Sequence, residues 1–121
     1  MDFNSILIGS EDPQRLVEYY TKVLGKAGFS DGGYTGWQLG SGFVTIGPHT
    51  EVKGRNAAPG RIIWNIESKD VQGDFDRMKA AGATVVTEPY SFELEGSTGT
   101  SIATFEDPDG NYFQLMSPME M

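Results

Sequence analysis

Residues 105–118 read Phe-Glu-Asp-Pro-Asp-Gly-Asn-Tyr-Phe-Gln-Leu-Met-Ser-Pro. The segment 107–110 is typical of a tight turn, because Pro108 fixes φ at the second position and Gly110 tolerates a positive φ. After the turn, polar and apolar side chains alternate, which predicts a strand with Gln114 on one face and Leu115 on the other. The stretch therefore predicts a hairpin that ends on a half-buried strand.

The rest of the chain shows one order of elements twice. In the first half we expect a strand over 3–8, a helix from Pro13 that Gly25 ends in a left-handed conformation, and strands near 29, over 34–39 and over 43–46. In the second half we expect a strand over 61–66, a helix over 71–82, strands over 83–87 and 101–105, and the closing hairpin. Residues 48–60 are a predicted linker or lid, and residues 91–100 a predicted loop with Glu93 and Glu95 facing water. Each half holds about 60 residues, a size at which burial of apolar surface is marginal, so we expect the halves to pack on each other or on a second copy.

The pairing of two strands in the first half follows from a two-residue turn. Gly40 and Ser41 suit a hairpin turn whose first position has a positive φ. This turn places Leu39 opposite Gly42 and Trp37 opposite Val44. Gln38, Phe43 and Thr45 then share one face of the sheet. The other face carries Trp37, Val44 and Ile46, which we expect to pack on the apolar side of the preceding helix.

Length and charge restrict the class of protein. The chain has 121 residues, which predicts one domain, and it carries 17 acidic and 9 basic residues for a formal charge of −8. This charge disfavours nucleic acid and anionic membranes as partners and attracts cationic ligands weakly. No long apolar segment and no basic leader are present, so a cytoplasmic location is expected.

Residue counts also exclude several kinds of chemistry. The absence of Cys excludes disulfides, thiolate nucleophiles and Cys-based metal sites. The single histidine, His49, lies in the Pro/Gly-rich segment, where it and Glu51 would make a poor metal site. No Ser-His-Asp arrangement and no phosphate-binding Gly-rich loop can be identified.

Three segments resemble one known superfamily. The hairpin Glu-Asp-Pro-Asp-Gly-Asn-x-x-x-Leu, together with Tyr-Thr-Lys-Val-Leu-Gly at 20–25 and Met-Lys-Ala-Ala-Gly-Ala at 78–83, resembles the vicinal oxygen chelate superfamily of glyoxalases, bleomycin-resistance proteins and extradiol dioxygenases. The resemblance covers nearly the whole chain. It implies an α+β fold of two βαβββ modules, about 1–48 and 60–121, whose sheets curl around a cleft, and it implies a homodimer.

The resemblance also raises the question of a metal ion. Metal-dependent members of the superfamily place four ligands, usually His and Glu, on strands that face the cleft. The corresponding positions here hold Ser5, Thr45, Arg61 and Gln114. A guanidinium offers no lone pair, and divalent ions of this class prefer imidazole or carboxylate ligands. We therefore expect no metal and no cofactor.

The period-2 pattern of the strands predicts the lining of the cleft. The expected ligand-binding residues are Ser5, Leu7, Gln38, Phe43, Thr45, Arg61, Ile63, Asn65, Phe105, Tyr112, Gln114 and Met116. They form an apolar and aromatic surface with a few polar groups, as small-molecule sites do. Trp64 is expected on the helix side, in the core. For Phe105 and Tyr112, packing and ligand stacking are both open, and Arg61 either clamps an anionic group or pairs with a surface carboxylate.

Three functions remain in consideration. The first is a metal-independent protein that binds a small organic or aromatic compound, and the acidic chain suits a cationic one. Such a protein would be similar to the drug-sequestering, antibiotic-resistance branch of the superfamily. The second is a glyoxalase-like lyase, isomerase or dioxygenase with atypical or no metal ligands, in which Tyr112, Arg61 or a carboxylate acts as acid or base. The third is a partner-binding module whose cleft is filled by side chains.

Overall fold

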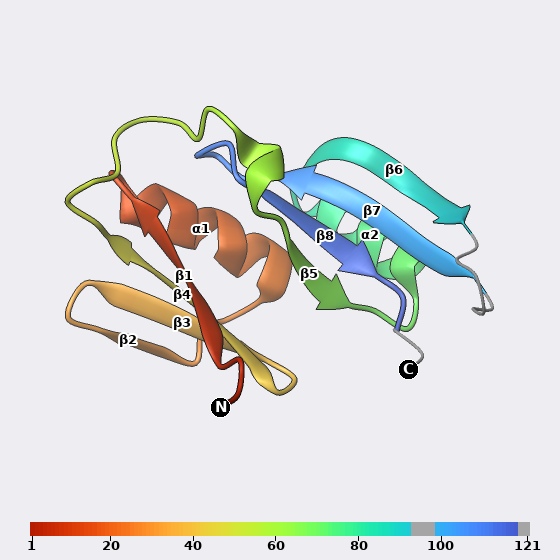
Figure 1. The fold of residues 1–121 in the computed structure, drawn as a ribbon, viewed down its shortest axis with the longest axis horizontal. Helices are drawn as coiled ribbons and strands as arrows, with labels where there is room; N and C mark the ends of the chain where they lie inside the picture. Colours follow the sequence, from red (N-terminus) through yellow and green to blue (C-terminus); the bar gives the residue numbers. More distant parts are fainter. Residues whose placement is uncertain (93–98, 119–121) are drawn as a thin grey trace. The chain divides into compact units, whose positions relative to one another are not determined.

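The structure is a computed structural model that describes residues 1–92 and 99–118. The chain divides into two compact units, Met1–Arg55 and Asn56–Met121, which we call the N-terminal and C-terminal units. In the described residues, each unit pairs one α-helix with a four-stranded mixed sheet (Figure 1). Both follow the order strand, helix, three strands. The predicted α+β fold with two βαβββ modules is therefore confirmed, with two separate sheets.

The N-terminal unit forms a sheet in the order β1-β4-β3-β2. Its elements are β1 (Ser5–Ser10), α1 (Pro13–Leu24), β2 (Phe29–Asp31), β3 (Tyr34–Leu39) and β4 (Gly42–Pro48). β1 runs parallel to β4, and the other pairs are antiparallel. The first strand begins two residues later than expected and continues to Ser10.

Helix α1 begins and ends where its sequence predicts. The side chain of Asp12 accepts a hydrogen bond from the backbone N–H of Arg15 at 3.4 Å, and Pro13 occupies the first turn. The helix ends at Gly25, whose φ of 94° is positive as expected, but whose ψ of −169° lies outside the left-handed helical region. Neither described α-helix is long and apolar enough to cross a membrane.

The core of the N-terminal unit lies between α1 and the sheet. Its members, all buried, are Leu16, Tyr20, Val23, Trp37, Val44 and Ile46. The indole N–H of Trp37 donates to the carbonyl of Gly25 at 2.8 Å, which ties the sheet to the end of the helix. The predicted register is confirmed, since Leu39 pairs with Gly42 and Trp37 with Val44, and Gly40 has a φ of 62°.

The C-terminal unit forms a sheet in the order β5-β8-β7-β6. Its elements are the 3₁₀ helix η1 (Pro59–Arg61), β5 (Trp64–Glu67), α2 (Val71–Ala80), β6 (Thr84–Phe92), β7 (Thr100–Glu106) and β8 (Tyr112–Met116). The expected strand over 61–66 begins only at Trp64. The expected loop over 91–100 is shorter, because Ser91, Phe92 and Thr100 belong to strands, and its residues Glu93 and Glu95 lie outside the described residues.

Side chains on the α2 face of this sheet form three rows across the strands. The first row is aromatic, with Trp64, Phe113 and Phe105 on neighbouring strands and Phe75 of α2 stacked on Phe105 at 5.3 Å. The second row is aliphatic, with Ile66, Leu115 and Ala103. A third row at the end of the sheet holds Ser68, Ser117, Ser101 and Ser91, and we call it the serine row. Trp64 therefore lies on the helix side, as predicted.

The quoted turn has the predicted conformation. The N–H of Gly110 donates to the carbonyl of Asp107 at 2.9 Å, and Gly110 has a φ of 83°. The buried carboxylate of Asp107 accepts from the N–H groups of Asp109 at 2.9 Å and Asn111 at 3.0 Å. The N–H of Asn56 donates to the carbonyl of Asp109 at 2.8 Å, which fixes the start of the unit to this turn.

Edge strand β6 is irregular. Its pairing with β7 shifts between Val85 and Thr87 and again between Thr87 and Tyr90. In the second shift, Glu88 and Pro89 together stand opposite one residue of β7. An extra residue of this kind is a β-bulge, and an edge strand tolerates a proline because no outer neighbour needs its N–H.

Candidate functional site

The helix-free face of the N-terminal sheet gathers five of the predicted site residues. They are Ser5, Leu7, Gln38, Phe43 and Thr45, which the pairing of β1, β4 and β3 places on one face. Ser5, Leu7 and Gln38 are exposed, and Phe43 and Thr45 are half-buried. Leu7 keeps 53% of its surface exposed, so this face offers apolar contact area to a ligand.

Two phenylalanines meet on this face across the middle strand. Phe29 on β2 and Phe43 on β4 stack with ring centroids 5.4 Å apart and an interplanar angle of 5°. The strand between them carries Gly36, where an added Cβ would overlap Phe29 Cε1 and lie 2.9 Å from Phe43 Cε1. The rings therefore occupy the space that a side chain at position 36 would fill.

A third ring lies on the same face in the same way. An added Cβ on Gly47 of β4 would overlap the ring of Tyr34, which keeps 38% of its surface exposed. Asp31, exposed on β2, pairs with Tyr34 and so shares its face. We call Phe29, Tyr34 and Phe43 the aromatic platform. Sequence reasoning missed Phe29 and Tyr34, although a glycine inside a strand signals close approach by a neighbouring group.

The helix-free face of the C-terminal sheet gathers four more predicted residues. Asn65, Tyr112, Gln114 and Met116 share it, as the pairing of β5 with β8 requires. The amide of Gln114 donates to Thr104 Oγ1 at 2.9 Å, so its orientation on this face is fixed. Tyr112, Gln114 and Met116 are half-buried, and Asn65 is exposed.

Three predicted site residues are placed differently. Phe105 is fully buried against Phe75 and Phe113, so its expected position on the ligand-facing side is wrong. Arg61 lies exposed in η1, and Ile63 precedes β5, so neither belongs to the strand that was expected to carry them. The cause is the short η1 turn, which delays the strand to Trp64.

The four positions that the resemblance assigns to metal ligands carry no imidazole and no carboxylate. Gln114 uses its amide N–H as a donor toward Thr104, and Ser5 and Thr45 offer neutral hydroxyls. Arg61 would add a positive charge and no donor pair. Among the described residues, no three His, Asp or Glu side chains gather in a group that could bind a metal ion. The ring nitrogen Nδ1 of His49 accepts the N–H of Glu51 at 3.1 Å, within the same loop.

Comparison with known proteins identifies the class. The glyoxalase-like domain family matches residues 5–116, and the chain belongs to this family of the vicinal oxygen chelate superfamily. No curated protein matches the sequence significantly.

Solved structures agree on the fold. A glyoxalase-related enzyme from Fulvimarina pelagi is similar with a TM-score of 0.73 and 16% identity, over 97% of this chain and 88% of that one. A glyoxalase/bleomycin resistance protein from Albidiferax ferrireducens T118 has a TM-score of 0.71 and 17% identity, over 96% and 98% of the two chains. A glyoxalase/bleomycin resistance protein/dioxygenase family enzyme from Burkholderia phytofirmans PsJN has a TM-score of 0.71 and 19% identity, over 98% and 100%.

Proposed function

We propose that this protein binds a small planar aromatic compound carrying positive charge, and that it does so without a metal ion. The aromatic platform of Phe29, Tyr34 and Phe43 carries the proposal. The helix-free face of the C-terminal sheet, with Tyr112, Gln114 and Met116, is a second ligand-binding surface in this proposal. Proteins named for bleomycin resistance are among the structural neighbours, which is consistent with a binding role.

The arrangement of the rings favours a flat ligand. Stacked Phe29 and Phe43 present a wide apolar surface, and their fixed positions over Gly36 reduce the entropy lost when a ligand binds. An offset stack of a ligand ring on such a pair contributes about 0.5 to 1.5 kcal/mol beyond burial of its apolar area. Thr45, half-buried at the centre of the face, adds one hydroxyl to orient the compound.

Charge favours a cation over an anion. Aromatic faces attract cations by about 0.5 to 2 kcal/mol, depending on how far the cation is desolvated. Asp31 shares the face of Tyr34, and the whole chain carries a formal charge of −8. Both features repel an anionic ligand of the same shape.

The test compares an aromatic cation with an aromatic anion by isothermal titration calorimetry. We expect acriflavine, a planar cation, to bind and anilinonaphthalene sulfonate, an aromatic anion, to bind at least about tenfold more weakly. Phe43→Leu should weaken acriflavine binding by about tenfold, since it removes a stacking face and keeps apolar volume. Tyr19→Leu, on α1, is the matched control and should leave binding unchanged. Equal binding of the two probes, or no loss in Phe43→Leu, would contradict the proposal.

Metal independence has its own test. Purified protein should contain far less than one equivalent of Ni, Zn, Mn or Fe, and acriflavine affinity should be the same before and after treatment with a chelator. About one equivalent of bound metal would instead favour a metal-dependent lyase or dioxygenase.

We also propose a homodimer. Both units leave large apolar side chains exposed outside the aromatic platform, among them Phe3 in one unit and Ile62 and Val86 in the other. Exposed apolar surface commonly marks an interaction site when it is extensive. Light scattering at micromolar concentration should report twice the mass of the chain, and a monomer would contradict this part.

A further inference from the structure

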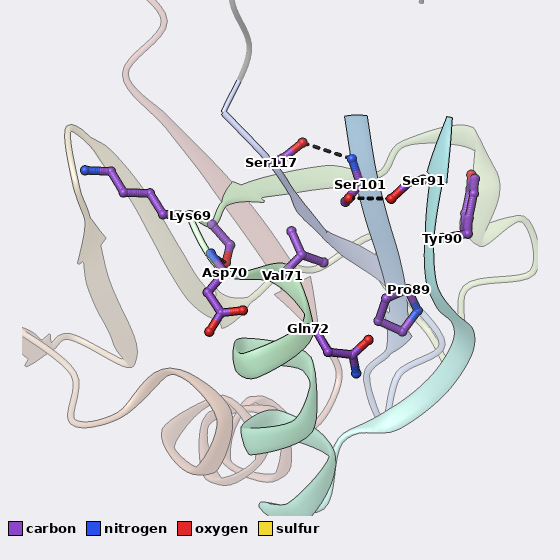
Figure 2. Close-up of a pocket in the computed structure, with 10 residues that line it drawn as sticks. Lys69, Asp70, Val71, Gln72, Pro89, Tyr90, Ser91, Ser101 and Ser117 are labelled. Atoms are coloured by element: carbon purple, nitrogen blue, oxygen red, sulfur yellow. Dashed lines mark hydrogen bonds between the residues drawn. The ribbon is translucent and has the colours of Figure 1, made fainter. Parts of the chain in front are cut away.

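The C-terminal unit contains a cavity on the side of its sheet that faces α2. The cavity has a volume of about 380 Å³ and lies beside the start of α2, against the last part of β6 and the first part of β7 (Figure 2). Its lining residues are Ser68, Lys69, Asp70, Val71, Gln72, Pro89, Tyr90, Ser91, Ser101 and Ser117. Because this is the helix-facing side of the sheet, the cavity is separate from the surfaces assigned to the aromatic compound.

The serine row forms one wall of this cavity. The hydroxyls of Ser91 and Ser101 are 2.8 Å apart in a hydrogen bond, and Ser117 Oγ accepts the N–H of Ser101 at 2.9 Å (Figure 2). A hydroxyl has one hydrogen and two acceptor lone pairs. Among the described residues, these bonds use one of the two hydroxyl hydrogens of the Ser91–Ser101 pair and none from Ser117. One hydrogen of the pair, the hydroxyl hydrogen of Ser117 and several oxygen lone pairs can therefore bond to a ligand. The wall can thus donate and accept at the same time.

The rest of the lining is mixed in character. The side chain of Val71 and the ring of Pro89 supply apolar surface, and Gln72 supplies an amide (Figure 2). Tyr90 pairs with Ile102 and its ring lies on the other side of β6, so it does not enter the cavity. A small molecule here meets both apolar carbon and hydroxyl groups.

Charge around the cavity is balanced and does not favour an anion. At the N-terminus of α2, the carboxylate of Asp70 already accepts a hydrogen bond from the backbone N–H of Gly73 at 3.0 Å. Ser68 donates its hydroxyl to the carboxylate of Asp74 on α2 at 2.6 Å, so a second negative charge lies next to Ser68. Lys69 in the lining and Arg77, which lies 3.8 Å from the carboxylate of Asp74, balance these two charges, so no excess positive charge remains to hold an anion. Serine hydroxyls are also weak ligands for a divalent cation.

We propose that this cavity binds a neutral polyhydroxylated molecule the size of one sugar ring. Such a molecule carries hydroxyls that both donate and accept, as the serine row does, and carbon–hydrogen faces that pack on Val71 and Pro89. A volume near 380 Å³ is at the small end of ligand cavities, which suits a single ring. This inference does not depend on the binding of an aromatic cation.

The test follows backbone amide signals by NMR during titration of the whole protein with glucose, mannose, galactose and myo-inositol, and separately with inorganic phosphate. We expect at least one neutral polyol to shift the amides of Val71, Ser101 and Ser117 in a saturable way at millimolar concentration. Phosphate should shift them less.

Two variants and one control make the test specific. Ser91→Ala, at an exposed position, and Ser101→Ala should each weaken polyol binding by about tenfold, because one hydrogen bond of the wall is lost. Ser30→Ala, in the N-terminal unit, should leave it unchanged. Saturable binding of phosphate with no response to any polyol, or shifts unaffected by Ser91→Ala in a folded protein, would overturn the proposal. No saturable shift from any of these probes would overturn it as well.

Discussion

Phe29 and Phe43 lie in parallel planes, 5° apart in angle and 5.4 Å apart in centroid, although the strands that carry them are not neighbours. The glycine at position 36, on the strand between them, makes this contact possible. The absence of a side chain at position 36 of β3 thus allows side chains from β2 and β4 to meet across it. This relationship leads directly to a first prediction.

Gly36→Ala should displace the aromatic platform. The new Cβ would overlap the ring of Phe29 and crowd that of Phe43, and overpacking of this kind costs about 1 to 3 kcal/mol of unfolding free energy. Binding of a planar cation should weaken in parallel. Urea denaturation and calorimetry measure the two effects. Gly28→Ala is the control, because its Cβ would meet only the carbonyl of Gly36, at 3.7 Å. Similar stabilities for both variants would mean that the rings move aside without cost.

Phe105→Ala should destabilise the protein strongly. Phe105 is fully buried between Phe75 and Phe113, and truncation of such a residue to alanine costs about 3 to 5 kcal/mol. Tyr112→Ala, on the other face of the same hairpin, should cost clearly less because Tyr112 is only half-buried. The midpoints of urea unfolding distinguish them. If the two variants lost equal stability, the assignment of Phe105 to the core would be wrong.

Asp107→Ala should loosen the closing hairpin. The carboxylate accepts two backbone N–H groups inside the protein, and hydrogen bonds to a charged group contribute about 1.5 to 3 kcal/mol each before relaxation. We expect a loss of roughly 2 to 4 kcal/mol in unfolding free energy, measured by urea denaturation. Exposed Asp2→Asn provides a control with an unchanged midpoint. Hydrogen exchange should accelerate at Asp109 and Asn111, and unchanged exchange there would contradict the prediction.

Gln114→Glu should not create a metal site. The new carboxylate would accept the hydroxyl of Thr104, while Ser5, Thr45 and Arg61 still offer no strong ligands. Elemental analysis of the purified variant should find far less than one equivalent of divalent metal. Stoichiometric metal together with turnover of a glyoxalase substrate would show that other residues complete the site.

Strong local signals made much of the fold predictable. The Gly40–Ser41 turn fixed the register of a hairpin, because a two-residue turn leaves one pairing, and Pro13 and Gly25 marked the two ends of α1. The alternation of polar and apolar residues correctly placed Gln114 and Leu115 on opposite faces of β8. These signals act within a few residues, which is why a single sequence contains them.

Other placements depended on turn lengths and on distant residues. The expected face of Phe105 is wrong because Phe105 pairs with Phe113, on the helix side of the sheet. Tyr112, on the other face, pairs with Glu106 instead. Arg61 was placed on a strand because nothing local distinguishes the η1 turn from an early strand start. The aromatic platform and the serine row combine residues from several strands, so they become visible only when the pairing is known.

The irregular course of β6 has a consequence for behaviour at high concentration. Two bulges and Pro89 interrupt the regular spacing of backbone groups along this edge. An approaching strand from another molecule would find no continuous ladder to extend, so the sheet is protected against fibril growth from that side. Straightening the edge, for example by replacing Pro89 and deleting Val86, would give the chain a template for amyloid-like stacking.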